Sequence, residues 1–206
     1  MKKDYQARLT EISARDRAIW DTGAFFAGMD EAGRGPLAGP VCAACVVMPT
    51  QPLLLYVDDS KTVTEKRREM LYDQIQETAL FVGVGLASAQ EIDAINILEA
   101  TKLAMRRAAQ GAPCGLFLID AIERIDLPGQ VQGIIHGDRE CYSIAAASII
   151  AKVTRDRIMR ELDARYPGYG FAQNKGYGTA QHIAALQENG PCPEHRRSFI
   201  THFVNA

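Results

Sequence analysis

The chain has 206 residues and a net charge of −2, with 47% hydrophobic and 23% charged residues. That composition is ordinary for a soluble globular protein with one domain and a sizeable core. No apolar run approaches the roughly 20 residues that span a bilayer. The charged first twenty residues also lack the apolar core of a signal peptide. We therefore exclude a membrane protein and expect a cytoplasmic one, with residues 1–206 forming a single domain and no need for more than a monomer.

The first strong feature is a pair of adjacent acids after an apolar segment. "AFFAGMD" is typical of a buried strand, and it leads directly into Asp30 and Glu31. A single acid there is usually a solvated strand end. Two adjacent charges after a buried strand need either water or cations, so the pair is a candidate metal site.

A turn rich in glycine follows these acids and connects to a second predicted strand, "VCAACVVM". Gly33, Gly35 and Gly39 can simply permit a tight connection with positive φ. Alternatively, the bare backbone lets a sugar-phosphate chain approach closely, and Arg34 supplies a charge-assisted contact to it. Spacing alone leaves both interpretations open.

The cysteines raise a zinc alternative. Cys42 and Cys45, with Cys192 and His195, have zinc-like spacing. However, residues three apart on a strand point to opposite faces, so the first two cannot chelate one ion, and buried thiols are the simpler interpretation. Neither His195 nor His136 is assigned a catalytic role.

Two helices and a third strand are predicted next. Thr62 with Glu65 forms a capping-box pattern in a helix over 58–78, and Asn96 with Glu99 forms another at the start of a helix over 96–110. "ALFVGVGLAS" between them predicts a strand.

The second half continues the alternation of strands and helices. "GLFLID" predicts a short strand that ends on Asp120, and "VQGIIHGD" predicts another that ends on Asp138. Residues 142–162 predict the longest helix, apolar nearly all round in its first half. "GTAQHIAALQENG" predicts a late helix ended by Gly190. The pattern indicates an α/β domain with a mixed central sheet flanked by helices.

Three predicted strands thus end on acids, and strand ends meet at one edge of an α/β sheet. Asp30, Glu31, Asp120 and Asp138 are expected to converge there. Four carboxylates repel one another unless cations lie among them, and hard oxygen ligands favour Mg²⁺ or Mn²⁺. Two such ions about 4 Å apart are the usual apparatus for phosphodiester hydrolysis.

Candidate contacts to a nucleic-acid backbone lie nearby in the sequence. Ser148, Lys152 and Arg155 share one face of the long helix, at i, i+4 and i+7, and Lys61 follows the paired acids of "DDSK". A solvated surface is the alternative for all four. The net charge is +3 from Arg139 onward and −5 before it, which is compatible with an anionic substrate beside metal-binding acids.

The sequence resembles the ribonuclease HII family, the type 2 ribonucleases H, from about Gly28 to Phe199. The segments that carry the resemblance are "GMDEAGRGPLAGPV", "DDSKTVTEKRREML", "NILEATKLAM", "GDRECYSIAAASIIAKVTRDRIM", "YPGYGFAQNKGYGT" and "GPCPEHRRSF". The resemblance implies a ribonuclease H-like fold. It also implies an endonuclease, dependent on Mg²⁺ or Mn²⁺, that cuts the RNA strand of RNA–DNA hybrids and single ribonucleotides in duplex DNA, leaving 5′-phosphate and 3′-hydroxyl ends.

The resemblance also implies residue roles. The metal-binding acids of the family fall on Asp30, Glu31, Asp120 and Asp138. The Gly-Arg-Gly element falls on Gly33, Arg34 and Gly35, and the tyrosine that stacks at the ribose falls on Tyr177, with Tyr169 as the competing assignment. The run "LIDAIERI" lacks the glycine usual after the third acid, and Thr62 replaces a usual second lysine.

The resemblance further implies a catalytic domain with an N-terminal arm over 1–23 and a C-terminal helical segment over about 179–206. Three rival functions remain: a noncatalytic nucleic-acid-binding module, another nuclease on this fold such as ribonuclease HIII or a junction resolvase, and an α/β domain with incidental acids. The first would be expected to lose an acid, and all four acids are present.

Overall fold

The computed structural model describes residues 4–120, 122 and 124–204. Within them, five strands form one mixed sheet in the order β3-β2-β1-β4-β5. The neighbours β1–β2 and β2–β3 are antiparallel, whereas β1–β4 and β4–β5 are parallel. The strands are β1 (Phe26–Ala32), β2 (Val41–Val47), β3 (Phe81–Ala87), β4 (Leu116–Asp120) and β5 (Gln130–Ile134). The mixed sheet flanked by helices is confirmed.

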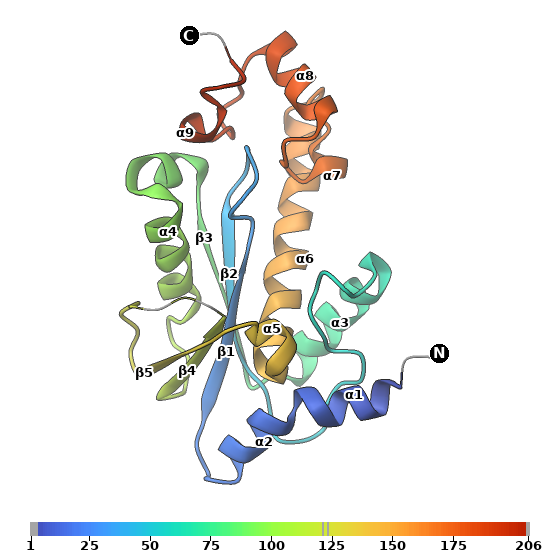
Figure 1. Cartoon of the computed structure of the whole chain (residues 1–206), viewed down its shortest axis with the longest axis vertical. Coiled ribbons are helices and arrows are strands. Elements are labelled where there is room, and N and C mark those ends of the chain that lie inside the picture. Colours follow the sequence, from blue (N-terminus) through green and yellow to red (C-terminus); the bar gives the residue numbers. More distant parts are fainter. Residues whose placement is uncertain (1–3, 121, 123, 205–206) are drawn as a thin grey trace.

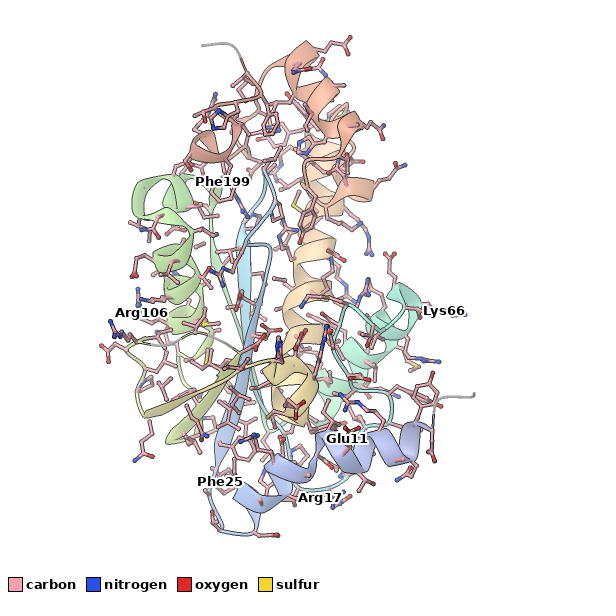
Figure 2. The ribbon with its side chains drawn as sticks, in the orientation of Figure 1. Glu11, Arg17, Phe25, Lys66, Arg106 and Phe199 are labelled. Atoms are coloured by element: carbon pink, nitrogen blue, oxygen red, sulfur yellow. The ribbon has the colours of Figure 1, made fainter. Side chains whose placement is uncertain are left out.

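Helices cover both faces of this sheet (Figure 1). The long helix α6 and the shorter α3 lie on one face, and α4 lies on the other. At one end, Phe199 packs against the α4 side of the core (Figure 2). In the described part of the chain, no helix is long and apolar enough to cross a membrane. The helices are α1 (Tyr5–Ile12), α2 (Ala14–Trp20), α3 (Glu65–Thr78), α4 (Ala89–Ala108), α5 (Gly137–Glu140), α6 (Tyr142–Arg165), α7 (Phe171–Asn174), α8 (Ala180–Asn189) and α9 (Arg197–Ile200).

Strand β2, which lies between β3 and β1, is buried on both faces. Its alternate residues pack into different cores, so that Cys42 lies in the core beneath α3 and α6, and Cys45 lies in the core beneath α4. The prediction that these two cysteines face opposite ways is confirmed. One ion cannot bind both thiols, which excludes the zinc alternative.

Helix α3 begins later than its sequence pattern predicts. Its first residue is Glu65 and its N-cap residue is Thr64. The Thr62 hydroxyl instead donates to the carbonyl of Asp59, at 2.9 Å, inside the preceding turn. The predicted capping pair of Thr62 and Glu65 is therefore wrong.

Helix α4 begins earlier than predicted. Ser88 and Glu91 form a reciprocal capping box at its start, whereas Asn96 lies inside the helix at a kink with φ of 67°. The Asn96 side chain still accepts hydrogen bonds from the backbone N–H groups of Leu98 and Glu99. The predicted cap thus exists, but it restarts the second half of a longer helix.

Two strands, β1 and β5, end at other residues than the sequence predicts. β1 continues through Asp30 and Glu31 to Ala32, so both acids lie within the strand. β5 ends at Ile134, and His136 has a left-handed φ of 57° that turns the chain into the short helix α5. Asp138 is therefore presented by a helix rather than by a strand end.

The N-terminal segment, expected as an arm over 1–23, packs onto the domain. Leu9 and Ile12 of α1 belong to the core shared with α6. The buried carboxylate of Asp16 accepts hydrogen bonds from the N–H groups of Tyr142 and Ser143, both at 2.9 Å, and so caps α6 from a distance. Residues 1–3 of the predicted arm lie outside the described residues.

A close approach between α6 and β1 positions the acids. A Cβ atom at Gly28 would lie 2.1 Å from the carbonyl carbon of Ser143, so only glycine permits this contact. Asp30 is two residues further along the strand and faces the same side. The acid therefore lies beside the first half of α6.

Candidate active site

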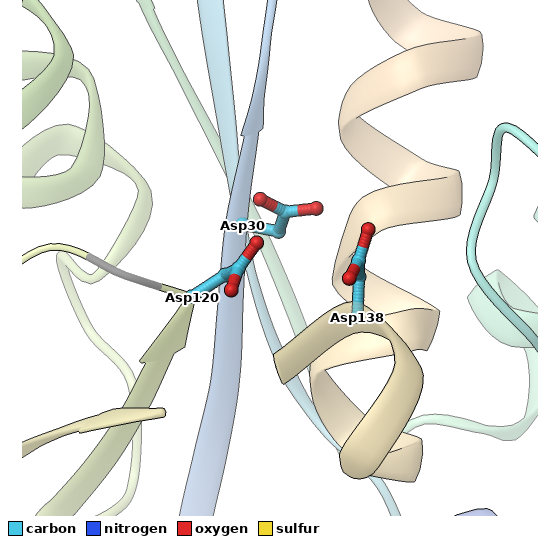
Figure 3. A group of neighbouring side chains, drawn as sticks. All are labelled: Asp30, Asp120 and Asp138. Carbon is cyan, nitrogen blue, oxygen red and sulfur yellow. The ribbon is translucent and has the colours of Figure 1, made fainter. Parts of the chain in front are cut away.

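Three of the four predicted acids lie together. Asp30 comes from β1, Asp120 is the last residue of the adjacent parallel strand β4, and Asp138 lies on α5. One carboxylate oxygen of each lies within 4.8 Å of the others (Figure 3). Such a set of hard oxygen atoms fits a divalent cation such as Mg²⁺ or Mn²⁺.

The electrostatics of the cluster favour a cation. Burial raises the pKa of Asp30 well above its usual range, and the nearby charges of Glu31 and Asp120 raise it further. Burial and the charge of Asp59 likewise raise the pKa of Asp138, although Lys61 opposes this. Buried like charges cost free energy unless a counter-charge lies among them.

Glu31 lies at the edge of this cluster. Its Oε1 is 3.4 Å from a guanidinium nitrogen of Arg34. Its other oxygen, Oε2, is buried and has no hydrogen-bond partner among the described residues. Burial raises the pKa of this carboxyl group, although Arg34 opposes the rise. An orphaned buried oxygen beside three acids also fits a cation-binding site.

A cleft of about 440 Å³ opens over the acids. All eight of the predicted substrate-binding residues line it, together with three of the four acids. Asp138 is linked to the cleft by a 3.2 Å ion pair with Lys61. The lining residues are Asp30, Glu31, Ala32, Gly33, Arg34, Gly35, Ser60, Lys61, Asp120, Ser148, Lys152, Arg155 and Tyr177.

The two candidate tyrosines have different surroundings. Tyr177 is 46% exposed and lines the cleft opposite Gly35. Tyr169 is only 7% exposed, donates its hydroxyl to the carbonyl of Gly190 at 2.7 Å and packs against the ring of Phe171. Tyr177 is thus the tyrosine available to a substrate in the cleft.

The predicted polar face of α6 is only partly available to a phosphate. Ser148 donates to the hydroxyl of Ser60 at 2.8 Å, and the Lys152 ammonium lies 2.7 Å from Asp156 Oδ1. Burial lowers the pKa of Lys152. These two residues still face the cleft.

Arg155 is buried and donates to the backbone carbonyls of Ala38, Pro40 and Lys175. Its guanidinium holds loops together in the interior, although the residue also lines the cleft, and its contact to a phosphate stays a prediction. Its position on the helix face was predicted, but its burial depends on loops distant in sequence.

The structure also reveals residues without a predicted role. Asp59 is fully buried and lies 3.2 Å from Arg139, beside the Lys61–Asp138 pair. Arg196 and His182 are fully buried and contact the loops that line the cleft. Arg196 lies in the segment "GPCPEHRRSF", but no local pattern in that segment indicates a role for it or its partners. Ala121 and Glu123 of "LIDAIERI" lie outside the described residues.

Comparisons with known proteins agree on one family. The model of the family "Ribonuclease HII" matches residues 27–205. The ribonuclease HII of Desulfitobacterium hafniense (strain DSM 10664 / DCB-2) is 50% identical, over 96% of this chain and 79% of the relative. The ribonuclease HII of Geobacter sulfurreducens is 56% identical, over 84% of this chain and 81% of the relative.

Solved structures show the same fold. Ribonuclease H2 of Pyrococcus horikoshii OT3 superposes with a TM-score of 0.70 at 27% identity, covering 84% of this chain and 93% of that one. Ribonuclease HII of Archaeoglobus fulgidus, from a complex with PCNA, gives 0.71 at 26% identity, covering 84% and 94%. The sheet order and the acid cluster thus occur in a ribonuclease H-like fold. The chain belongs to the ribonuclease HII family, and it is a metal-dependent ribonuclease H, an endonuclease that hydrolyses phosphodiester bonds in the RNA of RNA–DNA hybrids.

Proposed function

We propose that this enzyme also incises duplex DNA at single embedded ribonucleotides, leaving 5′-phosphate and 3′-hydroxyl ends. The observation that supports this proposal is the shared cleft. The Gly33–Gly35 turn and Tyr177 line the same cavity as Asp30, Glu31 and Asp120. A ribonucleotide held by the turn therefore has its phosphodiester beside the acids, which couples recognition to cleavage.

We propose that Asp30, Glu31, Asp120 and Asp138 hold two divalent ions, Mg²⁺ or Mn²⁺. Bound ions supply Lewis-acid chemistry, activating the attacking water and neutralising charge on the leaving 3′ oxygen. The mutual repulsion of the acids and the unpaired Glu31 Oε2 support this assignment. Without bound cations, the carboxylates would repel the scissile phosphate.

Recognition depends on the 2′-hydroxyl, because that group distinguishes RNA from DNA at a single position. The backbone of Gly33 and Gly35 allows a sugar to approach, and Arg34 adds a charge-assisted contact. Tyr177 packs on the sugar from across the turn. Lys61 and Lys152, with Ser148, contact flanking phosphates in this proposal.

We further propose that residues 1–206 act as a single catalytic domain and as a monomer, in the cytoplasm. The single sheet, with a core on each of its faces, supports one domain. The substrate is an RNA–DNA hybrid or a ribonucleotide-containing duplex, and no membrane is involved.

A comparison of substrates tests the proposal. The full chain with Mn²⁺ is offered a duplex with one ribonucleotide, the same duplex in DNA alone, and a four-way DNA junction. We expect incision of the first only, and mass spectrometry of the products should find 5′-phosphate and 3′-hydroxyl ends. Cleavage of the junction, or failure to cut the ribonucleotide duplex, would overturn it.

A further inference from the structure

A buried arginine supports the turn that faces the substrate. Arg196 is fully buried, and its guanidinium donates to the carbonyl oxygens of Gly39 at 3.0 Å, Arg34 at 2.9 Å and Gly33 at 2.6 Å. No carboxylate among the described residues forms an ion pair with it. Burial, with the charge of Arg155, lowers its pKa to about 9. The backbone dipoles of the turn therefore supply the counter-charge.

These contacts determine which way the peptide groups of the turn face. In a planar trans peptide, the C=O and N–H groups point in opposite directions. Because the carbonyls of Gly33 and Arg34 point to Arg196, the N–H groups of Arg34 and Gly35 point away from it. Arg196 is not among the described residues that line the cleft, whereas the turn is. The arginine thus presents backbone donors on the side away from the protein interior.

A pair of buried histidines supports Tyr177 in a similar way. His182 Nδ1 lies 2.9 Å from the Tyr177 carbonyl oxygen, which can only accept, so Nδ1 carries the proton. His182 Nε2 then accepts from His195 Nε2, at 3.1 Å. His195 Nδ1 accepts from the N–H of Cys192, also at 3.1 Å. Each ring is therefore neutral with one defined tautomer.

The two supports belong to one hydrogen-bonded unit. The N–H of Arg196 donates to the Leu37 carbonyl, and the N–H of Leu37 donates to the Gly176 carbonyl, both at 2.8 Å. The N–H of Gly39 donates to the carbonyl of Glu194 at 2.9 Å. The turn, the Tyr177 loop and the segment around Arg196 are thereby held at fixed distances from one another.

We infer that Arg196 and His182 are positioning residues for ribonucleotide recognition, acting through the Gly33–Arg34 peptides and the Tyr177 carbonyl respectively. The inference rests on the proposed function, in which the turn and Tyr177 recognise the ribonucleotide; that recognition is called their reading role below. Because Arg196 and His182 support the groups that contact the ribonucleotide, substituting either residue should weaken binding of the ribonucleotide. Because neither residue touches the acids, the hydrolytic step and the Mn²⁺ affinity should stay unchanged.

A matched pair of variants tests His182. The amide nitrogen of Asn in His182→Asn takes the place of Nδ1 and can still donate to the Tyr177 carbonyl. In His182→Gln the amide nitrogen reaches the place of Nε2 instead, which leaves that carbonyl without its donor. For the single-ribonucleotide duplex we expect KM to rise about tenfold in His182→Gln, with kcat nearly unchanged, and to stay within about twofold of wild type in His182→Asn. Equal KM values for the two variants would overturn the role of His182.

Arg196→Lys tests the positioning role of Arg196. An ammonium is a single point charge and cannot span three carbonyls as the planar guanidinium does, so we expect KM to rise about tenfold or more while Mn²⁺ affinity is retained. Leu71→Ala is the control, because it removes a buried side chain of α3 that belongs to the core beneath α6 and lines no part of the cleft. All variants are assayed at a temperature at which circular dichroism shows them folded.

Arg34→Ala and Tyr177→Ala separate this inference from the proposed function. If neither raises KM, the reading role falls and the positioning inference falls with it. If both raise KM while Arg196→Lys and His182→Gln behave like Leu71→Ala, the reading role stands and the positioning inference is overturned. Should Arg196→Lys fail to fold, the His182 pair alone decides.

Discussion

The ammonium of Lys61 lies 3.2 Å from Asp138 Oδ2 and 4.0 Å from Asp59 Oδ1. One edge of the acid cluster is therefore neutralised by a cation of the chain itself. Burial would lower the pKa of Lys61, but Asp138 and Asp59 outweigh it and the pKa is raised. The Lys61 side chain is 74% exposed, and we propose that it leaves Asp138 when a metal ion binds and contacts a phosphate instead.

Lys61→Ala should therefore separate metal binding from substrate binding. Because the ammonium of Lys61 no longer competes for Asp138, the variant should bind Mn²⁺ as tightly as wild type or about threefold more tightly. Its KM for an RNA–DNA hybrid should rise about threefold to tenfold. Calorimetry with Mn²⁺ and steady-state kinetics measure the two effects. Lys66→Ala, on the exposed surface of α3, is the control (Figure 2). A tenfold loss of Mn²⁺ affinity in Lys61→Ala would show that the lysine orients Asp138 instead.

Stabilisation of the enzyme by Mn²⁺ should depend on pH. The raised pKa of Asp30, caused by burial and by Glu31 and Asp120, means that the folded metal-free enzyme holds this proton tightly. That contribution to stability is present at low pH and is lost as pH rises through the raised pKa. Mn²⁺ must displace the proton, so the rise in Tm on adding Mn²⁺ should be larger at pH 8 than at pH 5.5.

The pH dependence should shrink in Asp30→Asn, which has no proton to displace at that position. Differential scanning calorimetry of both proteins, with and without Mn²⁺, measures it. An equal rise in Tm at the two pH values in wild type would contradict the proposed metal site.

The buried histidines should make the stability of the folded protein depend on pH in the opposite direction. Burial and the neighbouring ring of His182 lower the pKa of His195 to about 4. A depressed pKa stabilises the folded protein at pH above about 6.5, and that stability is lost as pH falls toward 4. The free energy of unfolding should decline by on the order of 2 kcal/mol over this window.

His195→Gln should show a shallower decline, because no ring at that position gains a proton. Urea unfolding at a series of pH values compares the two proteins, and their difference cancels the contribution of the carboxylates. Parallel curves for the two proteins would contradict a neutral His195 in the folded state.

The remote cap from Asp16 predicts a role for the N-terminal segment in stability. Asp16→Ala leaves the N–H groups of Tyr142 and Ser143 at the buried start of α6 without their acceptor. We expect a loss of about 2–4 kcal/mol in the free energy of unfolding. Exposed Asp21 provides a control, for which Asp21→Ala should cost within about 0.5 kcal/mol. An unchanged free energy of unfolding in Asp16→Ala would show that water caps α6 equally well.

Much of the fold followed from local sequence patterns. The apolar runs predicted all five strands, because burial and strand propensity agree in them. The start of α3 was missed because Thr62 and Thr64 are equally good local caps, and tertiary contacts of the 58–62 turn choose between them. β5 was extended too far because the left-handed turn at His136 leaves no residue signature such as glycine at that position.

The site shows the same division between local and long-range information. The convergence of Asp30, Asp120 and Asp138 could be predicted because strand ends meet at one edge of the sheet, whereas the spacing of the glycines left the role of the turn open. The burial of Arg155 and the partners of Arg196 could not be predicted, since both residues bond to carbonyls that are distant in sequence. A helix-face pattern indicates direction, but it does not show what packs over that face.

The most direct test of the account measures incision by one acid variant. Three proteins are compared: wild type, Asp120→Asn and, as the control, Asp126→Asn, which changes an exposed acid outside the cluster. Each is mixed, in excess over the substrate, with a duplex containing one ribonucleotide and with saturating Mn²⁺. Single-turnover rates are then compared. We expect Asp120→Asn to cut at least about 10³-fold more slowly than wild type and Asp126→Asn to cut at the wild-type rate. A rate for Asp120→Asn within tenfold of wild type would show that the acid cluster is not the catalytic centre.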